Sequence, residues 1–142
     1  MMSKKLNRFY PRIAADGTCD VVKISYGKDD DSCWLNGVYQ AIGNGCDVIA
    51  PVFCTAVDGT SYAVLVDEEG LLRMGCKPNE KLSECLRQLA MKKANLTRRE
   101  AEENVPLFYG TGLFAVLDEA EGDFVGWTSK KRAEAFLSDL VS

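Results

Sequence analysis

Two groups of acidic residues are the first candidates for chemistry in this sequence. Glu68 and Glu69 stand side by side in a turn, and a second group lies in a segment, residues 106–127, that holds no lysine or arginine. The members of the second group are Asp118, Glu119, Glu121 and Asp123. Two carboxylates serve acid–base or magnesium chemistry when they converge on one point, whereas adjacent carboxylates on a turn diverge. We therefore expect solvated charge at the pair and an acidic surface patch at the second group.

A nucleophile is not predicted, because the chain has six cysteines and no histidine. Histidine is the usual base for a cysteine or serine nucleophile, and the common mixed zinc sets need it as well. None of the cysteines belongs to a Cys-x-x-Cys pair. Cys33 stands at a predicted helix start, where the dipole favours a thiolate, but Asp29, Asp30 and Asp31 precede it and oppose that effect. The sequence predicts no catalytic residue, no metal and no cofactor.

A glycine-rich motif, Gly110-Thr111-Gly112, lies between two apolar runs. It lacks the third glycine, the lysine and the following helix start that phosphate-binding loops use. A bulge or strand bend is therefore the predicted structure. Tyr109 and Thr111, together with these bends, are the candidate lining of a small-molecule pocket.

The elements that must position these residues alternate between strand and helix patterns. Paired strands are expected at residues 10–14 and 21–24, joined by a turn at Asp16 and Gly17. Further pairs are expected at 47–54 and 61–66, and at 113–117 and 123–127, with a short strand at 71–74. Helical periodicity follows Ser32, Asn79, Thr97 and Thr128, and Thr97 and Glu100 have the spacing of a capping box. Thr128 is the predicted cap of the last helix. Because Pro51 has no amide donor, its strand is predicted to lie at an edge or to contain a bulge.

The length of 142 residues and the hydrophobic fraction of 46% fit one globular domain. Residues 1–8 are polar and basic without a periodic pattern, so we expect them to be disordered and residues 9–142 to form a single domain. Strands come in antiparallel groups with helices between them. This pattern predicts an α+β fold, in which an antiparallel sheet of about five to seven strands built from hairpins packs with about three to four helices.

Charge and hydropathy limit the partners that the chain is expected to bind. The formal net charge of −4 and the pI near 4.9 argue against direct binding to nucleic acid, which needs clustered positive charge. The first residues lack the apolar run of an export signal, and the longest apolar stretches are too short to span a bilayer. We therefore expect a cytoplasmic protein with no membrane contact.

Several short motifs follow one another in a recognisable order. They are Asp67-Glu68-Glu69-Gly70, Lys77-Pro78-Asn79, Tyr109-Gly110-Thr111-Gly112 and Gly126-Trp127-Thr128. In this order they resemble the domain of unknown function 3846 family, which occurs in bacteriophages, plasmids and the bacteria that carry them. The resemblance covers roughly residues 20–140, with Asp67 in place of the family's asparagine. It implies a mobile-element context and no mechanism, because the family has no established activity.

The leading hypothesis for function is a mobile-element protein that binds and inhibits a host protein, such as a CRISPR effector or a restriction nuclease. The acidic residues at 118–123 would then face the basic nucleic-acid channel of that defence complex. Two alternatives remain open. The first is a binder of a small molecule or nucleotide signal that uses Tyr109 and Thr111. The second is a metal-dependent enzyme that uses the carboxylates of Glu68 and Glu69.

Overall fold

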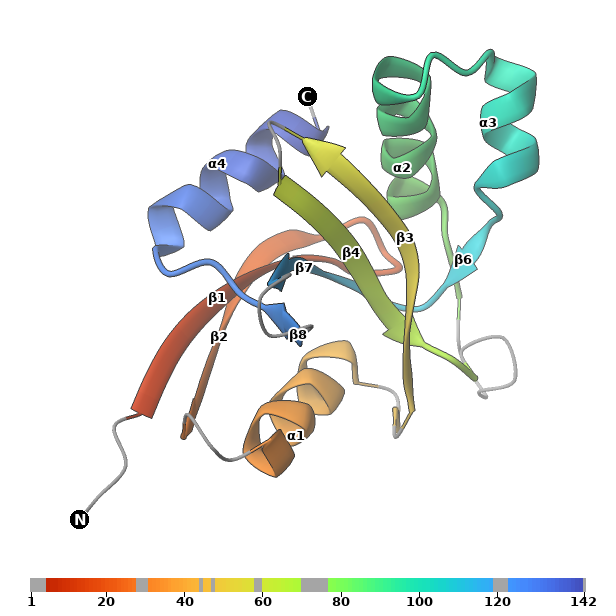
Figure 1. Ribbon diagram of the computed structural model, residues 1–142. Helices are drawn as coiled ribbons and strands as arrows, with labels where there is room; N and C mark the ends of the chain where they lie inside the picture. The colour runs from red at the N-terminus through yellow and green to blue at the C-terminus, as the bar shows by residue number, and fades with distance from the viewer. Residues whose placement is uncertain are drawn as a thin grey trace.

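The computed structural model describes residues 5–27, 31–43, 45–46, 48–57, 60–69, 77–118 and 123–141. Its main feature is a six-stranded antiparallel sheet with the strand order β2-β1-β7-β4-β3, in which β8 also pairs with β7 (Figure 1). These strands are β1 (Lys5–Ile13), β2 (Cys19–Gly27), β3 (Ile49–Val57), β4 (Thr60–Asp67), β7 (Gly112–Asp118) and β8 (Asp123–Val125). A separate two-stranded sheet pairs β5 (Pro78–Asn79) with β6 (Phe108–Tyr109).

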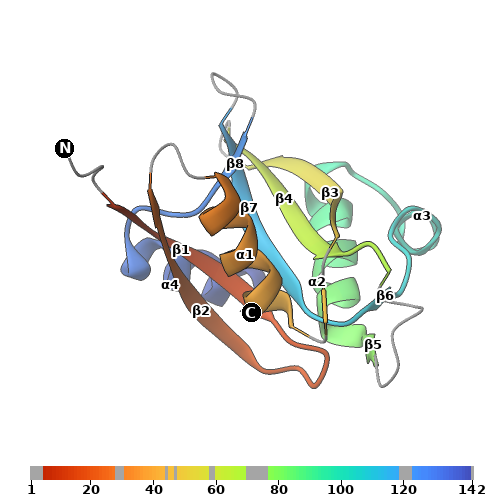
Figure 2. The same ribbon diagram turned by 90° about the horizontal axis from the view of Figure 1, so that it is seen from below.

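Four helices in the described part of the chain complete an α+β fold, as predicted from the sequence. They are α1 (Asp31–Ile42), α2 (Glu80–Lys93), α3 (Arg98–Asn104) and α4 (Lys130–Val141). Figures 1 and 2 show α1 on one face of the sheet and α2 and α4 on the other. None of the described helices is long and apolar enough to cross a membrane.

The hairpin of β1 and β2 uses the turn that the sequence predicts. Asp16 Oδ1 accepts a hydrogen bond from the amide of Thr18 at 2.9 Å, and Gly17 takes a φ of 92°, which glycine tolerates without steric strain. The strand β1 begins at Lys5, earlier than expected, because residues 5–8 pair with residues 24–27 of β2. Strand structure thus begins within the segment expected to be disordered, which is a correction for residues 5–8.

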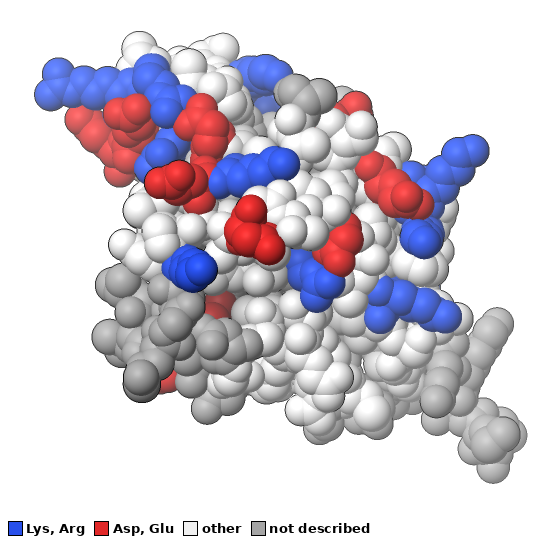
Figure 3. All heavy atoms as spheres, turned by 180° about the vertical axis from the view of Figure 1, so that it is seen from behind, with Lys and Arg blue, Asp and Glu red and all other residues white. Residues whose placement is uncertain are grey.

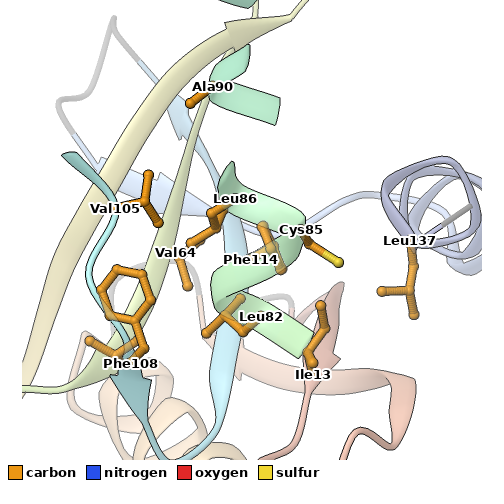
Figure 4. Close-up of a cluster of buried hydrophobic side chains, with 11 residues drawn as sticks. Ile13, Val64, Leu82, Cys85, Leu86, Ala90, Val105, Phe108, Phe114 and Leu137 are labelled. Atoms are coloured by element: carbon orange, nitrogen blue, oxygen red, sulfur yellow. The ribbon is translucent and has the colours of Figure 1, made fainter. Parts of the chain in front are cut away.

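The larger core fills the space between the sheet and the helices α2 and α4. Its members are Ile13, Val64, Val66, Leu82, Cys85, Leu86, Ala90, Val105, Phe108, Phe114 and Leu137. Figure 4 shows side chains from α2, from the sheet and from α4 pointing toward one another. The helical period after Asn79 predicts an apolar stripe of Leu82, Cys85, Leu86, Leu89 and Ala90, and these residues are buried in α2 apart from the half-buried Leu89.

The second core lies beneath α1. Val38, Ala41 and Ile42 of this helix pack with residues of β1, β2, β4 and β7. A Cβ on Gly37 would approach Ile24 Cγ2 to 2.6 Å, so the glycine permits close contact between α1 and β2. The buried hydroxyl of Tyr10 accepts a hydrogen bond from Trp34 Nε1 at 2.7 Å, and burial raises the pKa of Tyr10 above its ordinary value.

Local signals account for several element boundaries. The capping box at Thr97 and Glu100 is present at the start of α3. Pro51 lies in the edge strand β3, and the register shifts between Pro51 and Cys54, as expected for a proline in a sheet. The last helix is capped by Ser129, whose hydroxyl accepts from the amide of Arg132 at 3.4 Å, one residue later than the predicted cap. The strand predicted at residues 71–74 lies outside the described residues.

Candidate functional site

The predicted acidic patch lies at the β7–β8 hairpin. Asp118 and Asp123 are Cα partners in its register. Their side chains, and all of Glu119 and Glu121, lie outside the described part of the structure. The hairpin places Asp118 and Asp123, the two ends of the patch, opposite each other. The role of the patch in binding stays a prediction.

Glu68 and Glu69 lie at the other end of the sheet. Both are exposed and follow β4 directly. Their amides are occupied, since that of Glu68 donates to Val48 O and that of Glu69 donates to Asp67 Oδ1, each at 2.9 Å. Because β4 runs antiparallel to β7, its last residues lie beside the first residues of β7, whereas the acidic patch follows the last ones. The structure therefore does not bring the two acidic groups together.

Tyr109 and Thr111 are half-buried beside a polar junction. Tyr109 pairs with Pro78, and Gly110 takes a φ of 84°. At this junction the fully buried Asn79 donates from Nδ2 to Ile13 O at 2.9 Å and to Gly110 O at 2.8 Å. The glycine-rich motif is thus a bend, as predicted.

The same junction also starts α2. Asn79 Oδ1 accepts from the amide of Leu82 at 3.0 Å and so caps the helix. The hydroxyl of Ser83 donates to Asn79 O and accepts from the amide of Phe108. Two of the motifs that carry the family resemblance, Lys77-Pro78-Asn79 and Tyr109-Gly110-Thr111-Gly112, therefore meet in a network that holds the fold together.

An open pocket of about 320 Å³ lies between α2 and the end of α4. Among the residues that line it are Lys81, Cys85, Leu89, Lys92, Leu140 and Val141. Glu84 also lines it, but Arg98 donates to both of its oxygens at 2.6 and 2.7 Å and lowers the pKa of Glu84 to about 2. The sequence gives no signal for this pocket, because its two walls lie about fifty residues apart and only the fold brings them together.

The thiols and carboxylates of the described residues form no group of three or more that would hold a metal ion. Cys33 is exposed near the start of α1, whereas Cys46 and Cys85 are buried. Burial raises the pKa of the Cys85 thiol, and so favours its neutral form. Among the described cysteines, Cys46 and Cys85 thus lie in the core, Cys19 is half-buried and Cys33 is at the surface.

The strand β2 forms one edge of the sheet, and hydrogen bonds across β1 show which of its backbone groups point away from β1. Phe9 exchanges both backbone hydrogen bonds with Trp127 at 2.8 Å, on the side of β1 that faces away from β2. Its partner in β2 is Lys23, so these two residues form a non-hydrogen-bonded pair. The amide and carbonyl of Lys23 consequently point outward, and the same alternation applies to Val21 and Ser25.

The two edges of the sheet differ in how they are protected. Natural sheets block strand addition at their edges with proline, bulges or charged residues. The edge strand β3 has an exposed proline, Pro51, followed by a register shift. The edge strand β2 keeps a regular register with β1 over nine residues and contains no proline, and its one exposed charge is that of Lys23. We refer to the outward backbone groups of Val21, Lys23 and Ser25 as the open edge.

Comparisons with known proteins give no relative for this chain. No family model matches it, and neither the curated proteins nor the solved structures include a match. The resemblance to the domain of unknown function 3846 family therefore stays a prediction. The open edge is then the candidate site with the clearest geometry, and sequence reasoning missed it because a strand pattern at residues 21–24 does not indicate the position of the strand in the sheet.

Proposed function

We propose that this chain is a mobile-element protein that binds and inhibits a host protein through its open edge. The host protein is a nucleic-acid-processing defence enzyme, such as a CRISPR effector or a restriction nuclease. The mobile-element context comes from the resemblance to the phage and plasmid family. The acidic residues at 118–123 serve as a second contact, toward the basic nucleic-acid channel of the target.

The observation that carries this proposal is the contrast between β2 and β3. A strand from another protein is able to pair with β2 through main-chain hydrogen bonds, and this mode of recognition recurs in protein complexes. Val21, Lys23 and Ser25 supply the donors and acceptors for such pairing. The register shift after Pro51 interrupts the equivalent ladder in β3.

Replacing Lys23 by proline tests the proposal. Because the amide of Lys23 points outward, Lys23→Pro removes a donor from the open edge without removing a bond to β1. We expect the wild-type chain to inhibit a nuclease of the host bacterium and Lys23→Pro to weaken that inhibition at least about tenfold. The measurement is cleavage of a plasmid by purified host CRISPR effectors and restriction enzymes.

Two controls accompany this assay. The melting temperature of Lys23→Pro should lie within a few degrees of the wild-type value. Photo-crosslinking groups at Ser25, on the open edge, and at Arg99, exposed on α3, should give a target crosslink from Ser25 alone. Equal inhibition by the wild type and Lys23→Pro, or no inhibition of any nuclease of the host, would refute the proposal.

A second candidate function is the binding of a small molecule in the pocket between α2 and α4. Its volume of about 320 Å³ lies within the range of ligand sites, and Lys81 and Lys92 provide positive charge at its rim. A nucleotide bound there should raise the melting temperature by mass action, and Lys92→Glu should remove that increase. The matched control is Lys93→Glu, since Lys93 is exposed on α2 but does not line the pocket.

A further inference from the structure

The face on which a partner strand would place its side chains follows from the register of β2. Residues opposite each other in an antiparallel pair point their side chains to the same face of the sheet. Val21 packs against the core beneath α2 and α4, and Lys23 and Ser25 alternate with it along the strand. Partner residues that pair antiparallel with these three therefore lie on the face that α4 covers.

Lys23 and the first turn of α4 contribute positive charges to that face, and Glu134, one turn into the helix, is an exposed acidic exception. Lys23 is exposed there and makes no ion pair with another described residue. The helix α4 packs on β1 and β2 and begins three residues after Trp127. The backbone of Trp127 pairs with Phe9, and Phe9 is the partner of Lys23 in the β1–β2 register. The first turn of α4 thus follows closely on the residue that pairs with Phe9 on the side of β1 away from Lys23.

The first turn of α4 opposes the usual charge preference of a helix. The positive end of the helix dipole favours acidic residues, yet the turn contains the exposed Lys130, Lys131 and Arg132 and no acidic residue. Glu134 is the first acidic residue of the helix. Figure 3 shows lysine and arginine side chains, with acidic side chains among them, on the side where this end of α4 lies, to the right in that view. The dipole and these side chains add to the same positive potential.

The acidic residue of β2 does not offset this charge. Asp20 points to the opposite face, where its carboxylate accepts from Arg12 Nε at 2.8 Å and from Nη2 at 2.5 Å. Arg12 also donates to Ala41 O at the end of α1. Asp20 is therefore engaged beneath α1 and away from the first turn of α4.

A second copy of this chain is a poor occupant of the open edge. Antiparallel pairing of two β2 strands about a twofold axis would bring both Lys23 side chains and both first turns of α4 into one interface. Like charges in one interface lie within the Debye length at physiological salt and therefore repel each other. The lysine thus disfavours self-pairing while it attracts a strand of opposite charge.

From this charge distribution we propose that the open edge of β2 receives an extended acidic segment of the partner protein as an additional strand. Carboxylates of that segment lie beside Lys23 and the first turn of α4, while its backbone bonds to Val21, Lys23 and Ser25. The inference rests on the proposed function, which supplies a protein partner, and it names the chemistry that this partner presents.

The test uses the full-length protein labelled with ¹⁵N and two synthetic strand-length peptides. One peptide alternates valine with glutamate, and the other has lysine at each glutamate position. We expect the acidic peptide to shift the amide resonances of Val21, Lys23 and Ser25 and to bind at least about tenfold more tightly than its counterpart. Lys23→Gln, which keeps the amide donor, should weaken this binding about threefold, and Lys23→Pro should abolish it.

Several results would overturn the inference. Equal affinity for the two peptides would remove the preference for acidic segments and leave the proposed function intact. If neither peptide shifts any amide resonance, or if the shifts are confined to the pocket at Lys81 and Lys92, the open edge does not receive such a strand. Concentration-dependent shifts of the same amides without peptide would identify a second copy as the occupant. Failure of the proposed function itself is recognised separately, by equal nuclease inhibition from the wild type and Lys23→Pro.

Discussion

Replacing Phe114 by alanine is expected to lower the free energy of unfolding by about 4 kcal/mol. The side chain of Phe114 is 1% exposed and packs in the core beneath α2 and α4. Its ring also makes an edge contact with Phe136 of α4, with the ring centroids 5.6 Å apart. The substitution leaves a cavity at the point where β7 supports both helices, and urea unfolding measures the loss.

Phe114→Leu serves as the matched variant, because it keeps most of the buried volume. We expect it to lower the free energy of unfolding by about 1 kcal/mol. Trp127 stacks on Tyr62 and contacts Phe136, so the larger cavity should also change the fluorescence of Trp127. A loss below about 1 kcal/mol in Phe114→Ala would contradict the position of this ring in the core.

Replacing Asn79 by leucine is expected to lower the free energy of unfolding by about 3 kcal/mol. The leucine leaves the carbonyls of Ile13 and Gly110 without their donor and removes the cap of α2. Unpaired polar groups in a buried site are strongly unfavourable because water does not reach them. Urea unfolding again provides the measurement, with constant slope as the check for two-state behaviour.

Asn36→Leu is the control for this substitution. Asn36 is exposed on α1, so its replacement should change the free energy of unfolding by no more than about 0.5 kcal/mol. Equal effects at the two positions would show that the hydrogen bonds of Asn79 do not account for its contribution to the free energy of unfolding. The amides of α2 near Leu82 should exchange faster in Asn79→Leu, since the helix start loses its acceptor.

Features set by neighbouring residues were predicted correctly from the sequence. The capping box at Thr97 depends on residues three positions apart, and the turn at Asp16 and Gly17 depends on a side chain that bonds two residues on. Pro51 lacks a donor in any fold, so its place in an edge strand follows from its chemistry. These signals need no information about distant parts of the chain.

Features that join distant residues were not predictable in this way. The sequence correctly places a helix after Asn79, yet nothing local shows that its amide bonds to Ile13, which lies 66 residues away. The early start of β1 has the same origin, because polar residues 5–8 become a strand by pairing with β2. The position of β2 at the edge depends on which strands occupy the centre of the sheet.

The candidate site also has features that the sequence predicts and features that only the fold reveals. Glu68, Glu69, Tyr109 and Thr111 were singled out for their residue types, and the structure places them at a turn and beside a polar junction. The open edge consists of backbone groups, which every residue carries, so residue type gives no signal for it. The positive first turn of α4 is visible in the sequence, but its position beside β2 is not.

Hydrogen exchange along β2, followed residue by residue with NMR in the free protein, tests the open edge most directly. If the edge is open, the amides of Val21, Lys23 and Ser25 exchange rapidly, while those of Val22 and Ile24, which bond to β1, exchange slowly. Binding of the host target should then slow the first set and leave the second unchanged. Slow exchange at all five amides in the free protein would show that the edge is already covered and would contradict the account.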